Sequence, residues 1–179
     1  MGGKNKKKKS GGGGGGGGDG GGAPMATFAY DDTTSELADD NMTPAELKAK
    51  GNDSVKAGNH ATAFKLFTQA IIKGPPADEL HVFYSNRSLC ALSLKKFDMA
   101  TQDAQKCVEL KPDWSKGYSR LGSAHFFAGR FEEAAAAYGK GLAVEPTSEP
   151  LLQGLQAAKA ELEKPAMSGN GKQPAVRAA

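Results

Sequence analysis

Three landmarks recur along this chain at one spacing, and a fixed period constrains the fold more than composition does. An alanine, a proline and a small residue each recur at three equivalent positions. In each case the interval between the first two positions is three residues longer than the interval between the last two. Their positions are Ala63, Ala100 and Ala134, then Pro75, Pro112 and Pro146, then Gly51, Ser88 and Gly122. Because three independent features share the period, we predict one structural unit that occurs three times.

A period of about 34 residues is that of the tetratricopeptide repeat (TPR), in which two antiparallel helices form each unit. The longer step adds three residues in the 73–78 turn, where an insertion has a small free-energy cost. We therefore predict an all-α fold, a TPR superhelix of three helix-turn-helix repeats with a C-terminal capping helix. The predicted ranges are 44–77, 81–114 and 115–147 for the repeats, 148–163 for the capping helix and 44–164 for the whole TPR domain.

Local signals predict where these helices begin, cross and end. Thr43 followed by Pro44 and Glu46 predicts a capping box at the start of the first helix. The repeated alanines are expected where the two helices of a repeat cross closely, and the repeated prolines where the second helix ends. The capping helix is expected to attach through one apolar stripe: Leu151, Leu155, Ala158 and Leu162.

The two ends of the chain are expected to lie outside the folded domain. Residues 11–18 are eight consecutive glycines, which lose much backbone freedom on folding and bury no side chain. We predict a disordered low-complexity tail over 1–41 and a second disordered tail over 165–179. Residues 42–164 include sixteen basic and fourteen acidic side chains, so a cationic site there must arise from placement rather than from bulk charge.

Several classes of protein are not expected. Cys90 and Cys107 fall among apolar residues without a histidine cluster, which predicts two buried thiols, no metal site and no cofactor. We find no catalytic constellation or phosphate-binding motif and predict a protein without enzymatic activity. Without a signal peptide or an apolar run of about 18 residues, we expect a cytoplasmic protein with no membrane span. The five lysines within 4–9 leave the nucleus open as a second location.

Five polar residues occupy first-helix positions that face the inner surface of a TPR array. Lys48 and Asn52 lie one turn apart in the first repeat. Asn86 follows in the second repeat, and Lys116 and Arg120 lie one turn apart in the third. Each alone is compatible with an ordinary solvated helix face, but together they form converging donors that suit two carboxylates. We therefore predict that the groove binds the C-terminus of a peptide whose last residue is acidic.

Four segments carry a family resemblance: 47–52 (Leu-Lys-Ala-Lys-Gly-Asn), 84–88 (Tyr-Ser-Asn-Arg-Ser), 110–120 (Leu-Lys-Pro-Asp-Trp-Ser-Lys-Gly-Tyr-Ser-Arg) and 130–134 (Arg-Phe-Glu-Glu-Ala). They closely resemble the first TPR module of the heat-shock chaperone organising protein (Hop) family. The resemblance implies binding to the acidic C-terminal tail, ending Glu-Glu-Val-Asp, of heat-shock chaperones of the Hsp70 class, while related modules bind the Hsp90 class. The carboxylate clamp of the family falls on the five polar residues named above.

The resemblance also implies an apolar pocket for the bound tail, next to the clamp. Its predicted lining is Val55, Leu89, Leu92 and Phe127, with Phe126 as part of the wall. For the two phenylalanines, plain core packing is the alternative.

We accordingly predict a monomeric co-chaperone or adaptor whose partners are C-terminal tails of cytosolic heat-shock chaperones. The Hsp70 class is favoured, the Hsp90 class comes second, and no specific nucleic acid is expected. One alternative is a general TPR scaffold that holds an internal segment of its partner. Another is an adaptor that acts through its basic N-terminal tail on nucleic acid or a membrane. A third is a small glutamine-rich TPR co-chaperone.

Overall fold

A computed structural model of the chain describes residues 41–164, which form seven α-helices and contain no β-strand. The tails predicted over 1–41 and 165–179 lie outside the described residues, except for Asn41. The helices are α1 (Pro44–Lys56), α2 (His60–Ile72), α3 (Leu80–Ser93), α4 (Phe97–Leu110), α5 (Ser115–Phe127), α6 (Phe131–Val144) and α7 (Glu149–Glu163). The predicted fold of three helix pairs with a capping helix is confirmed.

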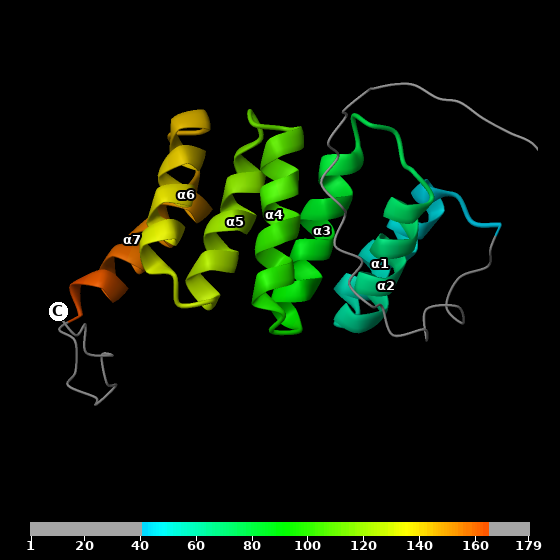
Figure 1. The fold of residues 1–179 in the computed structure, drawn as a ribbon, viewed down its shortest axis with the longest axis horizontal. Helices are drawn as coiled ribbons and strands as arrows, with labels where there is room; N and C mark the ends of the chain where they lie inside the picture. Colours follow the sequence, from blue (N-terminus) through cyan, green and yellow to red (C-terminus); the bar gives the residue numbers. More distant parts are fainter. Residues whose placement is uncertain (1–40, 165–179) are drawn as a thin grey trace, which may run out of the picture. The chain divides into compact units, whose positions relative to one another are not determined.

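Each helix packs against the next one along the chain, so the helices form a row (Figure 1). In addition, α3 contacts both α1 and α5, and α5 contacts α7. Within this part of the chain, no comparable contact joins α2 to α4 or α4 to α6. The first helices of the repeats therefore lie closer together than the second helices, which makes their side the inner surface of a curved row.

The small residues that define the period lie where paired helices cross. The three alanines at the crossings are fully buried: Ala63, Ala100 and Ala134. On the facing helices, a Cβ atom added to Gly51 would lie 2.7 Å from the ring of Phe67, and one on Gly122 would lie 2.6 Å from the ring of Tyr138. Because both distances are shorter than van der Waals contact, this helix spacing requires a small residue at each position.

The helix boundaries follow the predicted signals. The hydroxyl of Thr43 accepts the backbone N–H of Glu46 at 3.3 Å, and the Glu46 carboxylate accepts the backbone N–H of Thr43 at 2.8 Å. The turns inside the repeats use left-handed backbone, with φ of 76° at Gly58, 58° at Lys95 and 75° at Gly129. Glycine adopts this conformation freely, whereas Lys95 adopts it at a cost in free energy.

The capping helix α7 attaches as predicted over most of its length. Leu151 and Ala158 are buried, and Leu155 packs against them. Leu162 is 42% exposed and departs from the predicted stripe, because no further helix in the described segment covers the last turn of α7.

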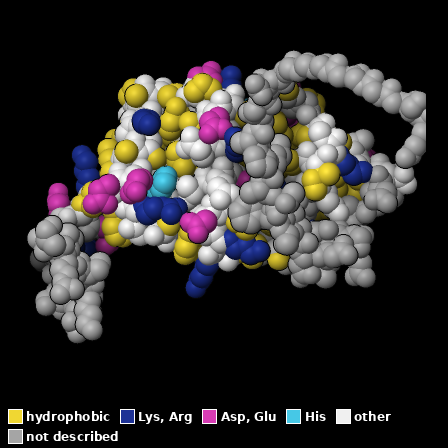
Figure 2. Space-filling view, viewed as in Figure 1, with side chains coloured by type: hydrophobic (Ala, Val, Ile, Leu, Met, Phe, Trp, Pro, Cys, Tyr) yellow, Lys and Arg dark blue, Asp and Glu magenta, His cyan; other side chains and the backbone are white. Residues whose placement is uncertain are grey.

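The two cysteines are buried free thiols, and burial raises the pKa of Cys90 to about 12 and that of Cys107 to about 11. Side chains of both charge signs are interspersed over the described residues on the face that Figure 2 shows. None of the described helices combines the length and the apolar character needed to cross a lipid bilayer. A cationic site in this segment therefore depends on where individual basic residues point.

Candidate peptide-binding site

The five residues predicted for the inner surface lie on α1, α3 and α5, and α3 contacts both of the other two helices. The rotation of each helix follows from its small residue, which must face the paired helix. The candidate residues lie on other sides of their helices, about 60° to 160° around the helix axis from the small residue of the same helix. The five residues are Lys48 and Asn52 on α1, Asn86 on α3, and Lys116 and Arg120 on α5.

Asn52 and Asn86 meet where α1 contacts α3. The side-chain amide of Asn86 donates a hydrogen bond to the carbonyl oxygen of Asn52, with an N–O distance of 3.1 Å. Both side chains are half-buried. This bond uses one N–H of Asn86 and no N–H of Asn52, so the pair retains further amide donors for a ligand.

Lys48 lies at the same helix contact but is already paired. Its ammonium group forms an ion pair with the carboxylate of Glu79. The same nitrogen lies 5.2 Å from the centroid of the Phe83 ring, and that ring is buried. Only 26% of the Lys48 side chain is exposed, so this charge is partly shielded from solvent.

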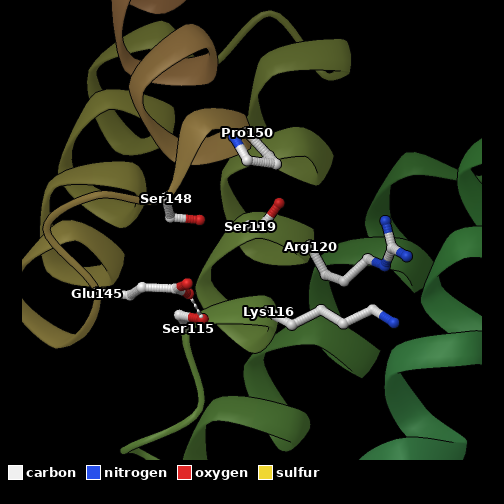
Figure 3. A pocket seen from close by; sticks show the side chains of 7 residues that line it. All are labelled: Ser115, Lys116, Ser119, Arg120, Glu145, Ser148 and Pro150. Atoms are coloured by element: carbon white, nitrogen blue, oxygen red, sulfur yellow. Dashed lines mark hydrogen bonds between the residues drawn. The ribbon is translucent and has the colours of Figure 1, made fainter.

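Lys116 and Arg120 leave α5 one turn apart and extend side by side toward the helices of the second repeat (Figure 3). Both line a groove of about 290 Å³ that continues between α5 and the start of α7. The nitrogen of Lys116 lies 5.8 Å from the centroid of the Trp114 ring. Within residues 41–164, neither side chain forms an ion pair with an acidic residue.

Arg120 is the most unusual of the five in its surroundings. Its Nε atom is buried and has no hydrogen-bond partner among the described residues. Burial lowers the pKa of the Arg120 guanidinium, and the nearby Cys107 and Cys90 act in the opposite direction. Since the ordinary arginine pKa lies far above neutrality, the group keeps its charge. A partly buried cation whose Nε has no acceptor within residues 41–164 is suited to receive an anion.

The residues predicted for the apolar pocket have different surroundings. Val55 and Leu92 are half-buried and pack against the core of the first two repeats. Leu89 is half-buried one turn after Asn86, and Phe127 is 62% exposed at the end of α5. Phe126 packs against the core formed by α6 and α7, so the core alternative applies to it.

Two acidic residues near these cations were not singled out from the sequence. Glu79 pairs with Lys48, and Glu145 accepts a hydrogen bond from the Ser115 hydroxyl at 2.5 Å, shown as a dashed line in Figure 3. Their partners lie 31 and 30 residues away in the chain, and no local motif reports such a contact. Both follow from the stacking of the repeats.

The arrangement has the chemistry of an anion-binding groove. The five candidate residues supply ammonium, guanidinium and amide donors on α1, α3 and α5, and Lys116 and Arg120 line the groove. Such groups bind carboxylates through hydrogen bonds, which are stronger where the donor is charged. Within residues 41–164, no three histidine, cysteine or acidic side chains are close enough to hold a metal ion.

A family model described as tetratricopeptide repeat matches residues 82–113 and 115–148. The Hsp70-Hsp90 organizing protein of Triticum aestivum is 51% identical over 114 residues, which is 64% of this chain and 19% of that protein. The chain therefore spans about a fifth of the length of this relative.

Solved structures of TPR domains resemble the described fold. The first TPR of Spaghetti (RPAP3), bound to the HSP90 peptide SRMEEVD, matches with a TM-score of 0.62 and 31% identity, covering 67% of this chain and 93% of that one. The second TPR domain of human RPAP3, in complex with the HSP70 peptide SGPTIEEVD, matches with a TM-score of 0.59 and 25% identity, covering 65% and 98%.

Proposed function

Because the chain belongs to the tetratricopeptide-repeat family and is homologous over 114 residues to an Hsp70-Hsp90 organizing protein, we propose that it is a co-chaperone or adaptor. Its ligand is the acidic C-terminal tail, of the Glu-Glu-Val-Asp type, of a cytosolic heat-shock chaperone. The result of binding is recruitment of the chaperone, without a chemical step. The chain acts as a monomer in this proposal.

The observation that carries the proposal is the state of Arg120. Its guanidinium is half-buried, lacks a protein partner for Nε in the described segment and extends beside the Lys116 ammonium. Removing a cation from water is unfavourable unless an anion compensates. A peptide chain end with an acidic last residue supplies two carboxylates at one point, which matches two adjacent cations.

We assign the carboxylates of the tail to five residues: Lys48, Asn52, Asn86, Lys116 and Arg120. Three or four charge-assisted bonds, less the free energy of ordering a flexible tail, give an affinity on the order of micromolar. For the apolar side chain of the tail we propose Val55, Leu89 and Phe127. Leu92 lies six residues after Asn86, on a different side of α3, and we assign it to the core.

Calorimetric titration with the peptide SGPTIEEVD, as a free acid and as a C-terminal amide, tests the proposal. We expect the amide to lose at least tenfold in affinity, because one charged bond contributes about 1.5–3 kcal/mol. Equal affinity for the two forms would support a general TPR scaffold and overturn the clamp. We expect the HSP90-type peptide SRMEEVD to bind more weakly, since the chain resembles the module associated with the Hsp70 class.

Deletion of residues 1–24 is the control for the N-terminal tail. This deletion removes the lysine run but leaves the described helices intact. Unchanged affinity is expected for the clamp, whereas loss of peptide binding would favour an adaptor that acts through the tail.

A further inference from the structure

The Lys48–Glu79 ion pair places an internal carboxylate on one of the three cations of the candidate clamp. Resting on the proposed function, we infer that Glu79 is an affinity-determining residue that competes with the chaperone tail for Lys48. To bind Lys48, the carboxylate of the tail must displace that of Glu79. In the free protein, one of the three clamp cations is therefore already paired with an internal carboxylate.

The surroundings of Lys48 make this pair more than a surface contact. The Lys48 side chain is 26% exposed and its ammonium group lies over the buried Phe83 ring. Solvent therefore screens the pair less than it screens a fully exposed ion pair. Lys116 and Arg120, by contrast, carry no such internal partner within residues 41–164.

The position of Glu79 supports a role in the site rather than in the helix. Glu79 is the N-cap residue of α3, a position where the shorter Ser, Thr, Asp and Asn side chains accept backbone N–H groups of the first turn. Its carboxylate makes no such capping bond and reaches Lys48 on α1 instead. With 46% of its side chain exposed, Glu79 has room to turn into solvent when a ligand arrives.

The contact is particular to the junction of the first two repeats. One repeat later, the position equivalent to Glu79 is occupied by Asp113, which pairs with Lys111 at 3.2 Å within its own turn. At the position of Lys48, the second and third repeats carry Ser85 and Ser119. The three additional residues of the 73–78 turn directly precede Glu79, so the Lys48–Glu79 pair lies next to the longer of the two turns that join the repeats.

Replacement of the carboxylate by an amide tests the competition. We expect Glu79→Gln to tighten binding of the peptide SGPTIEEVD about three- to tenfold, because a partly buried ion pair no longer has to be broken. Glu109→Gln is the matched control: it also removes one acidic group from a lysine pair, with Lys106 on the outer helix α4. The control should leave the affinity unchanged.

The same substitution made in a Lys48→Ala protein separates competition for Lys48 from direct charge repulsion between Glu79 and the peptide. In Lys48→Ala, Glu79 has no partner to hold, so Glu79→Gln should change the affinity no more than the control does. Because loss of Lys48 is expected to weaken peptide binding, the affinities of the Lys48→Ala variants are measured by NMR chemical-shift titration. Circular dichroism checks that each variant keeps its helix content.

Unchanged or weaker binding by Glu79→Gln in the wild-type background would overturn the inference, since Glu79 would then be neutral or would hold Lys48 in place for the ligand. An equal gain in both backgrounds would overturn it as well, because the effect would not act through Lys48. Absence of peptide binding by the wild-type chain would overturn the proposed function itself, so the two failures are distinguishable.

Discussion

Replacement of Arg120 by methionine should raise the stability of the free protein and weaken peptide binding at the same time. Methionine keeps most of the apolar stem of arginine but removes a buried N–H group that has no partner in the described segment. An unsatisfied buried polar group costs about 1–3 kcal/mol. After allowance for lost contacts, we expect a gain of about 1 kcal/mol, or roughly 3–6 °C in the melting temperature.

The effect of Arg120→Met on binding has the opposite sign. Loss of one charged hydrogen-bond donor at about 1.5–3 kcal/mol raises Kd about 10- to 150-fold. Lys116→Met is the matched variant, because Lys116 lies one turn away on the same helix but is exposed. It should weaken binding while leaving the melting temperature nearly unchanged.

Thermal unfolding by circular dichroism and calorimetric titration with SGPTIEEVD measure the two effects. A lower melting temperature for Arg120→Met would refute the argument from burial, because Arg120 would then stabilise the fold. An unchanged Kd would refute the site assignment. The opposite signs matter because a purely structural residue loses stability and binding together, whereas a binding residue kept at a cost in stability does not.

Two further predictions concern the fold that positions the site. The guanidinium of Arg87 donates to both carboxylate oxygens of Asp103 at 2.7 and 2.6 Å, and both side chains are about nine-tenths buried. Asp103→Ala should therefore destabilise the protein by about 3–5 kcal/mol in urea unfolding, while the double variant Arg87→Met with Asp103→Leu recovers much of the loss; a double variant as unstable as the single one would contradict this. Lys95→Gly should stabilise the protein by about 0.5–1 kcal/mol because Lys95 has a φ of 58°, and Lys95→Ala, which keeps the Cβ atom, should give no such gain.

The parts of the fold that could be predicted are those set by local chemistry. The capping box at Thr43 and Glu46 depends on residues three positions apart, and the structure confirms it. The crossings at Ala63, Ala100 and Ala134 were predictable because a recurring small residue has a recurring steric cause, and all three alanines are fully buried. The sequence period thus specified the helices and their rotation, and with them the inner helices on which the candidate residues lie.

The contacts that could not be predicted join residues from different repeats or different helices. The Glu79 carboxylate reaches Lys48 across 31 residues, and the path depends on how the longer turn at 73–78 places the start of α3. The ion pair of Arg87 with Asp103 could not be predicted either, because its two buried side chains come from different helices, α3 and α4. Periodicity gives the helix faces, but it does not say which side chain on a face finds a partner.

The division of the candidate site over three repeats ties binding to the stacking of the helices. α1, α3 and α5 each supply part of the candidate site, and close crossings at Gly51 and Gly122 set the spacing within the pairs α1–α2 and α5–α6. Gly122, for example, holds α5 against Tyr138 on α6, while Lys116 and Arg120 leave the same helix for the groove. A Cβ atom at Gly122 must therefore move α5 or Tyr138, and a shift of α5 moves two cations relative to Asn86. We therefore expect the affinity of the proposed site for a chain end to depend on helix crossings that the ligand does not contact.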